Sequence, residues 1–194
     1  MTQIILPTSY LAPICYYRNL VSYDEILIET AENYPKQTLR NRCYIAGANG
    51  VLMLTVPVVK PDSLKILTRN VRISDHGNWR HIHWNALVSA YNLSPFFEYY
   101  ADDFRPFYEK KYDFLLDFNM LLQEKICNLL DIQPNVKFTD EYLGVSTAAF
   151  DADVKPYRQV FSHKHGFIPD LSIVDLLFNM GPEAILYAKP LQWF

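Results

Sequence analysis

The densest group of positively charged side chains in the sequence comes just before a predicted β-hairpin. Lys36 stands four residues ahead of Arg40-Asn41-Arg42. Arginine binds carboxylates and phosphates through forked hydrogen bonds, and an asparagine amide can orient such a ligand. The pattern is therefore a candidate anion site, with Lys36, Arg40, Asn41 and Arg42 as its binding residues. The alternative is a solvated strand edge, where basic side chains discourage pairing with another strand.

Two of the five histidines lie in a predicted helix, two residues apart, at positions 81 and 83. About 200° of helical rotation separates His81 from His83, so their rings face different ways and do not share a metal ion. His83 borders an apolar stripe and is a candidate general base, because an imidazole pKa of about 6.5 suits proton transfer at neutral pH. The alternative is a half-buried histidine held by hydrogen bonds.

A second histidine pair, His163 and His165, lies in a predicted loop. Two ligands are too few for a protein zinc site, and no third Cys or His is close in sequence, so no metal site is expected. Asp170 and Ser172 are predicted helix caps. Asp175, three residues after Ser172, has the spacing of a capping-box partner.

The common motifs of phosphate binding and nucleophilic catalysis are absent. The sequence has no Walker A loop, no G-x-G-x-x-G, no G-x-S-x-G elbow and no C-x-x-C pair. With only 6 glycines in the chain, a glycine-rich phosphate cradle is hard to build. Any site must therefore consist of scattered polar residues.

Composition narrows the class of protein. A chain of 194 residues, half of them hydrophobic, suits one domain spanning residues 1–194. The formal net charge of −3, without a polybasic run, argues against a nucleic-acid partner. The sequence has no apolar span of 18 residues, so no transmembrane helix is expected. Its first residues lack Lys and Arg and are interrupted by Pro7 and Pro13, which is unlike a secretory signal. Three widely spaced cysteines indicate reduced thiols in a cytoplasmic protein.

The elements that would position these residues alternate between strands and helices. A strand at 3–6, a helix over 11–21 and a strand at 26–28 predict a βαβ unit with parallel strands, similar to the first unit of Rossmann-like folds. Asn49-Gly50 favours a tight turn and predicts an antiparallel hairpin over 43–56. Further predicted elements are a short strand at 70–74, helices over 79–91, from 94 and from 106 to about 130, a strand within 134–142 and a closing helix over 171–180.

Together these elements predict an α/β fold. It combines a mixed sheet that contains the N-terminal Rossmann-like βαβ unit, an added antiparallel hairpin and surrounding helices. The closing helix is expected to pack Leu176, Leu177 and Phe178 into the core.

Four blocks of the sequence resemble the WbqC-like family of bacterial proteins. They are residues 6–14 (LPTSYLAPI), resembling QPxYFPxxGYF; Lys36 with Asn41-Arg42 and 54–58 (LTVPV); 79–83 (WRHIH) with 90–91 and 94–97; and 167–179 (FIPDLSIVDLLFN). The blocks cover most of the chain, and the last is the most specific. The chain departs from the family pattern at Leu6, where the family has Gln, at Leu39, where many members have an aromatic residue, and in a shortened segment from Lys137 to Lys164.

The resemblance implies a role in biosynthesis of O-antigen or another surface polysaccharide, because genes of the family occur in such clusters. It also implies a possible transferase that adds glycine or another acyl group to a sugar. Asn41, Arg42 and His83 fall on family motifs, which supports their choice as site residues.

Two functional hypotheses follow. In the first, Arg42, helped by Lys36 and Arg40, holds the anionic part of a substrate, Asn41 orients it, and His83 takes a proton from the attacking amine or hydroxyl. In the second, the protein is a non-catalytic module that binds a nucleotide-sugar or a partner protein. The residues name no cofactor and no oligomeric state.

Overall fold

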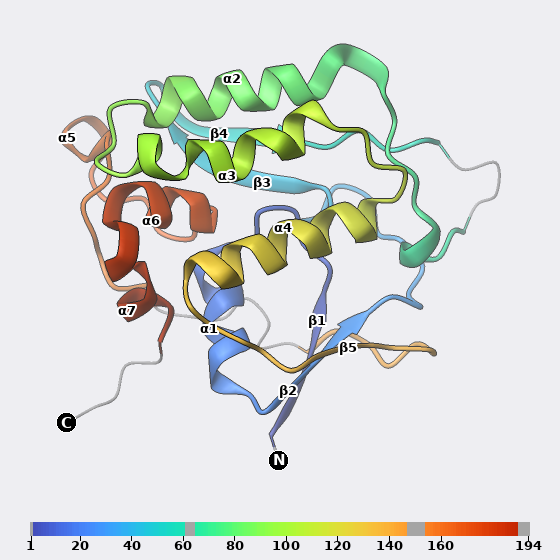
Figure 1. Cartoon of the computed structure of the whole chain (residues 1–194). Helices are drawn as coiled ribbons and strands as arrows, with labels where there is room; N and C mark the ends of the chain where they lie inside the picture. Colours follow the sequence, from blue (N-terminus) through green and yellow to red (C-terminus); the bar gives the residue numbers. More distant parts are fainter. Residues whose placement is uncertain (1, 61–64, 147–153, 190–194) are drawn as a thin grey trace.

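A small parallel sheet forms one end of the molecule in this computed structural model, which describes residues 2–60, 65–146 and 154–189 (Figure 1). Strand β1 (Gln3–Pro7) pairs in parallel with β2 (Glu25–Glu29), and β2 pairs in parallel with β5 (Val136–Phe138). Helix α1 (Ile14–Ser22) makes the crossover between β1 and β2. The predicted N-terminal βαβ unit is therefore confirmed.

The predicted hairpin is also confirmed, and it forms a two-stranded sheet of its own. Strand β3 (Arg42–Gly47) pairs antiparallel with β4 (Gly50–Thr55). Ala48 and Asn49 make the turn, and Gly50 takes the positive φ of +110° that such a tight connection needs.

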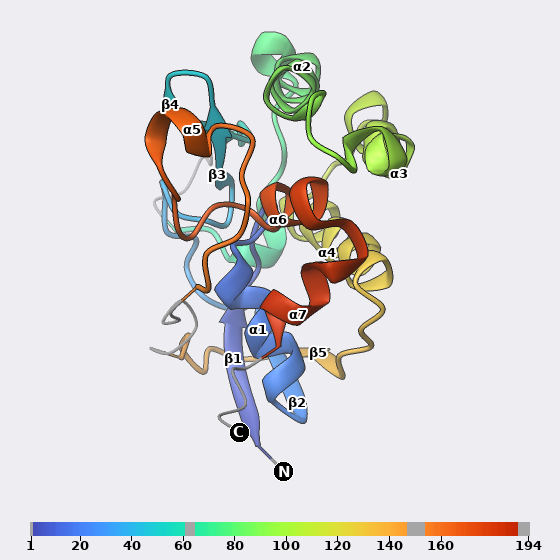
Figure 2. The ribbon, with the colours of Figure 1, turned by 90° about the vertical axis from the view of Figure 1, so that its left-hand side faces the viewer.

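The helices cover these sheets. Helix α4 lies closer to the parallel sheet than α2 and α3 do, and Figure 2 shows it on the side of α3 and α6, away from the hairpin (Figures 1 and 2). Helices α6 and α7 pack beside α1, and α5 lies near the turn of the hairpin (Figures 1 and 2). The helices that follow α1 are α2 (Trp79–Tyr91), α3 (Phe97–Glu109), α4 (Leu115–Leu129), α5 (Ser162–His165), α6 (Ile173–Met180) and α7 (Ile185–Ala188).

The break between α3 and α4 differs from the sequence prediction. The expected break at Arg105-Pro106 is wrong, because Pro106 lies inside α3 and the chain leaves the helix at Lys110. The backbone nitrogen of Leu115 donates to the backbone carbonyl of Val71, and the backbone nitrogen of Ile73 donates to the backbone carbonyl of Asp113, each at 2.9 Å. These tertiary bonds stop the helix more effectively than proline does. The expected strand at 70–74 is also wrong: Asn70 ends a 3-10 helix (Thr68–Asn70), and within this range only Arg72 and Ile73 form isolated bridges, with Phe114 and Val58.

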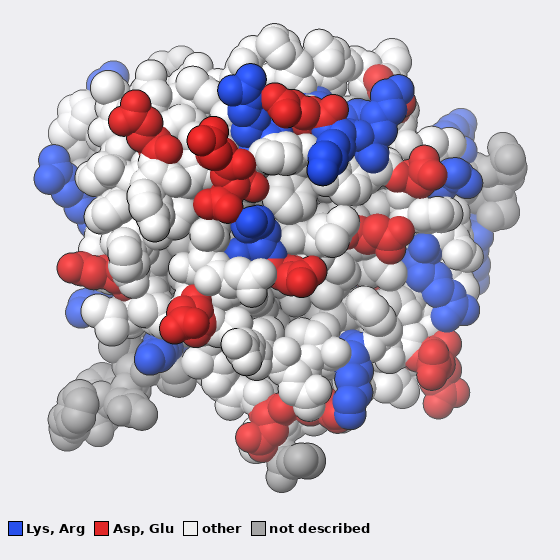
Figure 3. Space-filling model, viewed as in Figure 1, with Lys and Arg blue, Asp and Glu red and all other residues white. Residues whose placement is uncertain are grey.

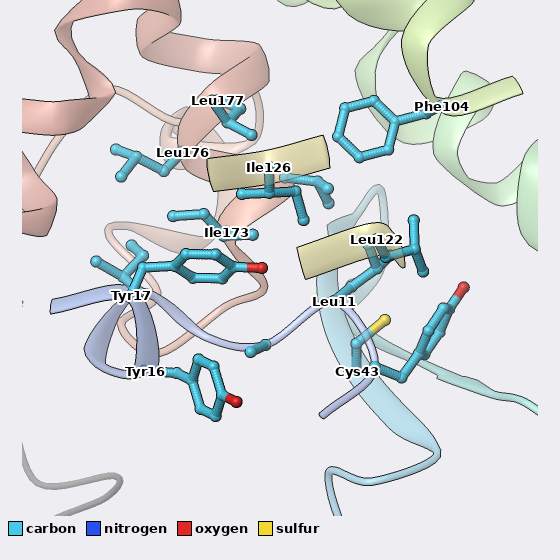
Figure 4. Close-up of a cluster of buried hydrophobic side chains, with 14 of the residues drawn as sticks. Leu11, Tyr16, Tyr17, Cys43, Phe104, Leu122, Ile126, Ile173, Leu176 and Leu177 are labelled. Atoms are coloured by element: carbon cyan, nitrogen blue, oxygen red, sulfur yellow. The ribbon is translucent and has the colours of Figure 1, made fainter. Parts of the chain in front are cut away.

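The core joins α6 to the N-terminal unit (Figure 4). The side chains of Leu176, Leu177 and Phe178 have no exposed surface, as predicted. Ser172 caps the helix by accepting a hydrogen bond from the backbone of Val174 at 3.4 Å. Gly181 ends the helix with a φ of +56°, and a Cβ there would lie 2.5 Å from the ring of Phe96, so a side chain at this position would clash. No helix within the described ranges is long and apolar enough to span a bilayer.

Candidate functional site

The carboxyl ends of parallel strands are the usual place for a ligand in an open α/β sheet. After β1 that place is filled by the protein itself: the Thr8 hydroxyl accepts from the Asn119 amide at 3.1 Å, and Ser9 donates to the carbonyl of Leu39 at 3.1 Å. Both side chains are buried. After β2, by contrast, residues 31–36 run over the surface and border two hollows. This segment is therefore the more accessible of the two strand ends for a ligand.

Arg40 belongs to the scaffold of this region. Its guanidinium forms a forked ion pair with Glu32, with Nε–Oε1 at 2.5 Å and Nη2–Oε2 at 2.7 Å, and the two side chains are each 10% exposed. Thr68 donates a further hydrogen bond to Glu32 at 3.2 Å. A guanidinium that is already paired in this way has little capacity left for a ligand.

Asn41 ties the base of the hairpin together. Its amide donates to the carbonyl of Val56 at 2.9 Å, and the backbone nitrogen of Val56 donates to the carbonyl of Asn41 at 2.8 Å. Asn119 donates to the neighbouring carbonyl of Arg40 at 2.8 Å. The side chain of Asn41 is buried and braces the segment that carries Arg42.

Arg42 and Tyr34 carry polar atoms that the protein does not satisfy. Arg42 Nε and the Tyr34 hydroxyl are both buried, and neither has a hydrogen-bond partner within the described residues. Burial raises the pKa of Tyr34 to about 12, while the charges of Arg40 and Arg42 act in the opposite direction, which places both guanidinium groups near this phenol. Unsatisfied buried polar atoms are rare in proteins and are often completed by a ligand or ordered water.

Tyr34 and Lys36 border a hollow of about 230 Å³ between residues 33–36 and the segments around 58–60 and 65–71. We call this the lysine hollow. It is lined by three lysines, by Tyr34 and Asn33, and by apolar side chains: Lys36, Lys60, Lys65, Val58, Val59, Ile66 and Val71. Considering only the residues that the structure describes, neither Lys36 nor Lys60 forms an ion pair. The hollow is therefore a concentration of positive charge against an apolar wall.

Sequence reasoning found Lys36 but missed Lys60, Lys65 and Tyr34. The two missed lysines follow the LTVPV block, so a charge pattern was visible in that part of the sequence. Lys36, the third lysine of the hollow, comes more than twenty residues before Lys60 in the sequence. Only the fold shows that both segments border one hollow.

His83 lies in a different environment. Its ring is buried, with 3% of the residue exposed, and its Nδ1 is 2.9 Å from the Tyr10 hydroxyl, which is 2.9 Å from the Tyr108 hydroxyl. Burial lowers the pKa of His83 to about 4, although a hydrogen bond to the backbone of Thr55 acts to raise it. The ring is neutral at pH 7, and both of its nitrogens have partners within the protein.

The structure does not bring His83 and the Arg42 side chain together. Cys43 is close enough to Tyr10 and Tyr108 to help raise the pKa of both phenols, so Cys43 faces the His83 cluster. Arg42 precedes Cys43 in β3, and neighbouring residues of a strand point to opposite faces. The five residues chosen from the sequence thus divide into a scaffold pair, a buried histidine cluster, and Lys36 and Arg42 near Tyr34.

A second cationic hollow, of about 580 Å³, lies between α2 and α3, and we call it the α2–α3 cleft. Its basic side chains face acidic ones, as seen over these two helices in Figure 3. Arg80 and Lys111 both pair with Asp75, the latter at 2.7 Å, and Arg105 pairs with Glu109 at 2.7 Å. His81, in the wall of the cleft, contacts Asn85 at 2.9 Å. The cleft is polar but has little positive charge left uncompensated.

Two buried carboxylates serve the fold. Asp175, expected in a capping box, instead accepts hydrogen bonds from Tyr91, Tyr157 and Gln159 at 2.8, 2.7 and 3.0 Å, and burial raises its pKa. Burial acts to raise the pKa of Glu29 too, but hydrogen bonds from Thr139 and three backbone nitrogens outweigh it, so the net direction is downward. Each carboxylate connects distant segments and leaves little room for a ligand.

The other candidate chemistries have little support. No group of three or more His, Cys, Asp or Glu side chains that could hold a metal ion occurs in residues 2–60, 65–146 and 154–189. Burial raises the pKa of the Cys15 thiol to about 11 and that of Cys127 to about 12, so neither is a ready nucleophile. A larger hollow of about 620 Å³ between α4 and β5 is lined by Asp117 and Glu124 and has no Lys or Arg, which disfavours an anion there.

Comparison with known proteins places the chain in a family without assigning a reaction. The model of the WbqC-like protein family matches residues 8–155 and 137–187. An uncharacterized protein of Mycobacterium tuberculosis, Rv1507c, is 27% identical over 231 aligned residues that cover 97% of this chain and 98% of the relative. The aligned length exceeds the 194 residues of this chain, so the relative contains residues that this chain lacks. No solved structure matches. Because the family model spans most of the sequence, the chain belongs to the WbqC-like protein family.

Proposed function

We propose that this protein binds a small phosphate-bearing molecule in the lysine hollow, and that its ligand is a nucleotide-linked sugar used in the assembly of a surface polysaccharide. The observation that carries the proposal is the gathering of Lys36, Lys60 and Lys65 beside the unsatisfied hydroxyl of Tyr34. The polysaccharide context comes from the family resemblance.

Charge and size favour a phosphate over a bulkier anion. Lysine ammonium groups act as compact point charges for phosphate oxygens, and each can donate up to three hydrogen bonds. A hollow of about 230 Å³ has room for a phosphate or diphosphate but not for a whole nucleotide-sugar. The rest of the ligand would extend over the surrounding surface, with Val58 and Ile66 providing apolar contact.

Arg42 completes the proposed site from its edge. Its Nε is buried without a partner in the described part of the chain, and its charge acts on Tyr34. Arg40 and Asn41 take supporting roles in this proposal, since their hydrogen bonds fix the segment that holds Arg42.

Binding without catalysis is the form of the proposal that the geometry supports best. Acyl or aminoacyl transfer to a sugar needs a base within reach of the attacking group. His83 is buried, its two ring nitrogens are engaged, and Arg42 points to the other face of β3. We therefore assign His83 a structural role and leave group transfer to a partner enzyme.

Calorimetric titration tests the binding. Uridine diphosphate N-acetylglucosamine and inorganic pyrophosphate serve as probes of the wild type, a Lys36→Ala/Lys60→Ala variant and a Lys164→Ala control. Lys164 is an exposed lysine of α5, on the opposite side of the molecule (Figure 1). We expect the double variant to bind both probes at least tenfold more weakly, since each lost charged contact is worth roughly 1–2 kcal/mol. Equal affinity in all three proteins would show that the site lies elsewhere.

A genetic test separates binding from catalysis. Cells lacking the gene are complemented with the wild type, with Lys36→Ala/Lys60→Ala or with His83→Gln, and their surface glycans are analysed by mass spectrometry. The proposal expects the glycan defect to persist with the lysine variant and to be repaired by a folded His83→Gln protein. Failure of folded His83→Gln to restore the glycan would instead favour the transferase hypothesis.

A further inference from the structure

The outer edge of the hairpin is apolar and unpaired. Three consecutive residues of β4 are well exposed: Val51 at 54%, Leu52 at 42% and Met53 at 45%. Tyr44, opposite Met53 in the register of the hairpin, is 38% exposed. Consecutive residues of a strand point to opposite faces, so exposure of all three means that β4 is uncovered on both sides.

The two edges of this small sheet are treated differently by the fold. On β3, the carbonyl of Tyr44 accepts from the backbone of Ser172 at 2.8 Å, and the nitrogen of Ala46 donates to the Tyr91 hydroxyl at 3.2 Å. On β4, the backbone of Thr55 is hydrogen-bonded to His83, but no described residue other than those of β3 hydrogen-bonds to the backbone of Val51, Leu52 or Met53. From residue 51 to residue 53 this edge therefore presents backbone donors and acceptors without partners among the described residues.

This edge lacks the features that normally prevent a free strand edge from pairing with another chain. Proteins usually protect a free edge with charged side chains, proline, a bulge or a covering segment. Residues 43–59 contain no Lys, Arg, His, Asp or Glu, and their only proline, Pro57, follows the end of β4. In an isolated two-stranded sheet such an edge is an unfinished pairing surface.

We propose that this edge pairs with the same edge of a second copy of the chain, with β4 antiparallel to β4, so that the two hairpins form one four-stranded sheet. A twofold axis through Leu52 puts Leu52 opposite its counterpart and Val51 opposite Met53. Because the strand is uncharged and apolar on both faces, this self-pairing brings no like charges together and leaves apolar side chains in contact.

A second copy fits the edge better than a partner of another kind. A charged partner would find no complementary side chain between residues 43 and 59. An identical strand meets apolar residues at every paired position. A contact of about five residues per strand is small for a stable interface, so the dimer should be weak, with a Kd on the order of micromolar.

Sedimentation velocity over about 1–500 µM protein tests the dimer. The wild type should shift from monomer to dimer with concentration, and Leu52→Lys should stay monomeric, because two ammonium groups would then face each other across the axis. Val51→Lys, at a position more exposed than Leu52, covers the case in which Leu52→Lys does not fold. Leu93→Lys, a lone residue 85% exposed after α2, is the matched control and should dimerise like the wild type.

A disulfide test fixes the register. Leu52→Cys should form a covalent dimer on mild oxidation, since paired residues of antiparallel strands have Cα atoms about 4.5–5.5 Å apart, within disulfide range. Leu93→Cys should not, and the three native cysteines are buried. A wild type that is monomeric up to 500 µM, dimerisation unchanged in the folded lysine variants, or cross-linking no faster at position 52 than at position 93 would each overturn the proposal.

Discussion

The lysine hollow and the α2–α3 cleft are each lined by three Lys or Arg side chains but differ in how these charges are compensated. Lys36, Lys60 and Lys65 line the first, and Arg80, Arg105 and Lys111 line the second. In the cleft, all three pair with Asp75 or Glu109, whereas no carboxylate among the described residues pairs with Lys36 or Lys60. Pairing, rather than the number of cations, therefore distinguishes a candidate anion site from a solvated polar surface.

The same distinction divides the arginines of the Arg40-Asn41-Arg42 motif. Arg40 is paired on both sides of its guanidinium fork with Glu32, while Arg42 Nε is buried without a partner in the described residues. Neighbours in sequence thus differ: Arg40 holds the scaffold, whereas Arg42 has an unsatisfied buried nitrogen and its charge acts on Tyr34, which lines the hollow.

The largest predicted effect concerns the paired arginine. Arg40→Ala should lower the free energy of unfolding by about 3–5 kcal/mol, because it leaves the Glu32 carboxylate buried and uncompensated. Urea denaturation measures this change. Arg42→Ala is the matched control and should cost less than about 1 kcal/mol. A similar loss of stability in the two variants would contradict the division of roles.

His83 should make stability fall in acid. The folded-state pKa of about 4 lies below the unfolded value of about 6.5, so the unfolded chain takes up the proton first and stability drops as pH falls from about 6.5 to 4. The free energy of unfolding should fall by about 3 kcal/mol, because the folded-state pKa of about 4 differs from the unfolded value of about 6.5. His83→Gln cannot titrate. The difference in the free energy of unfolding between wild type and variant, measured by denaturation at pH 7 and pH 4, therefore isolates the contribution of His83. If the free energy of unfolding fell equally in both proteins between pH 7 and pH 4, His83 would not be held in its neutral form by burial.

Ligand affinity gives the next effect. Arg42→Ala should weaken pyrophosphate binding about three- to tenfold, through loss of roughly 1 kcal/mol of charge-assisted contact. Lys111→Ala, in the cleft, should leave the affinity unchanged at the same ionic strength. Calorimetry at two salt concentrations checks both, and an equal loss in the two variants would mean that long-range charge rather than a built site controls binding.

The smallest effect tests the cleft itself. Asp75→Asn removes the carboxylate that pairs with Arg80 and Lys111, and so should create weak pyrophosphate binding in a Lys36→Ala/Lys60→Ala background. Fluorescence of Trp84 in the cleft wall would report it. If no binding appears, compensation by Asp75 is not what separates the two hollows.

Local patterns in the sequence predicted the βαβ unit, the hairpin and the closing helix, because strand alternation, turn residues and helical periodicity act over a few neighbours. The α3–α4 break was misplaced because long-range backbone bonds at Leu115 and Ile73 determine it. Lys36 and Arg42 were chosen from the charge pattern, and their role in binding stays a prediction. The pairing of Arg40 with Glu32, the burial of His83 and the approach of Lys60 to Lys36 all depend on segments that only the folded chain brings together.

The central question is where a phosphate ligand contacts the protein. Amide chemical-shift mapping by NMR during titration with pyrophosphate answers this question residue by residue. We predict shifts concentrated at residues 33–36, 58–60 and 65–71, with those of α2 and α3 unaffected. Shifts concentrated instead at residues 75–85 and 105–111, or no saturable shifts at all, would contradict the lysine hollow as the anion site.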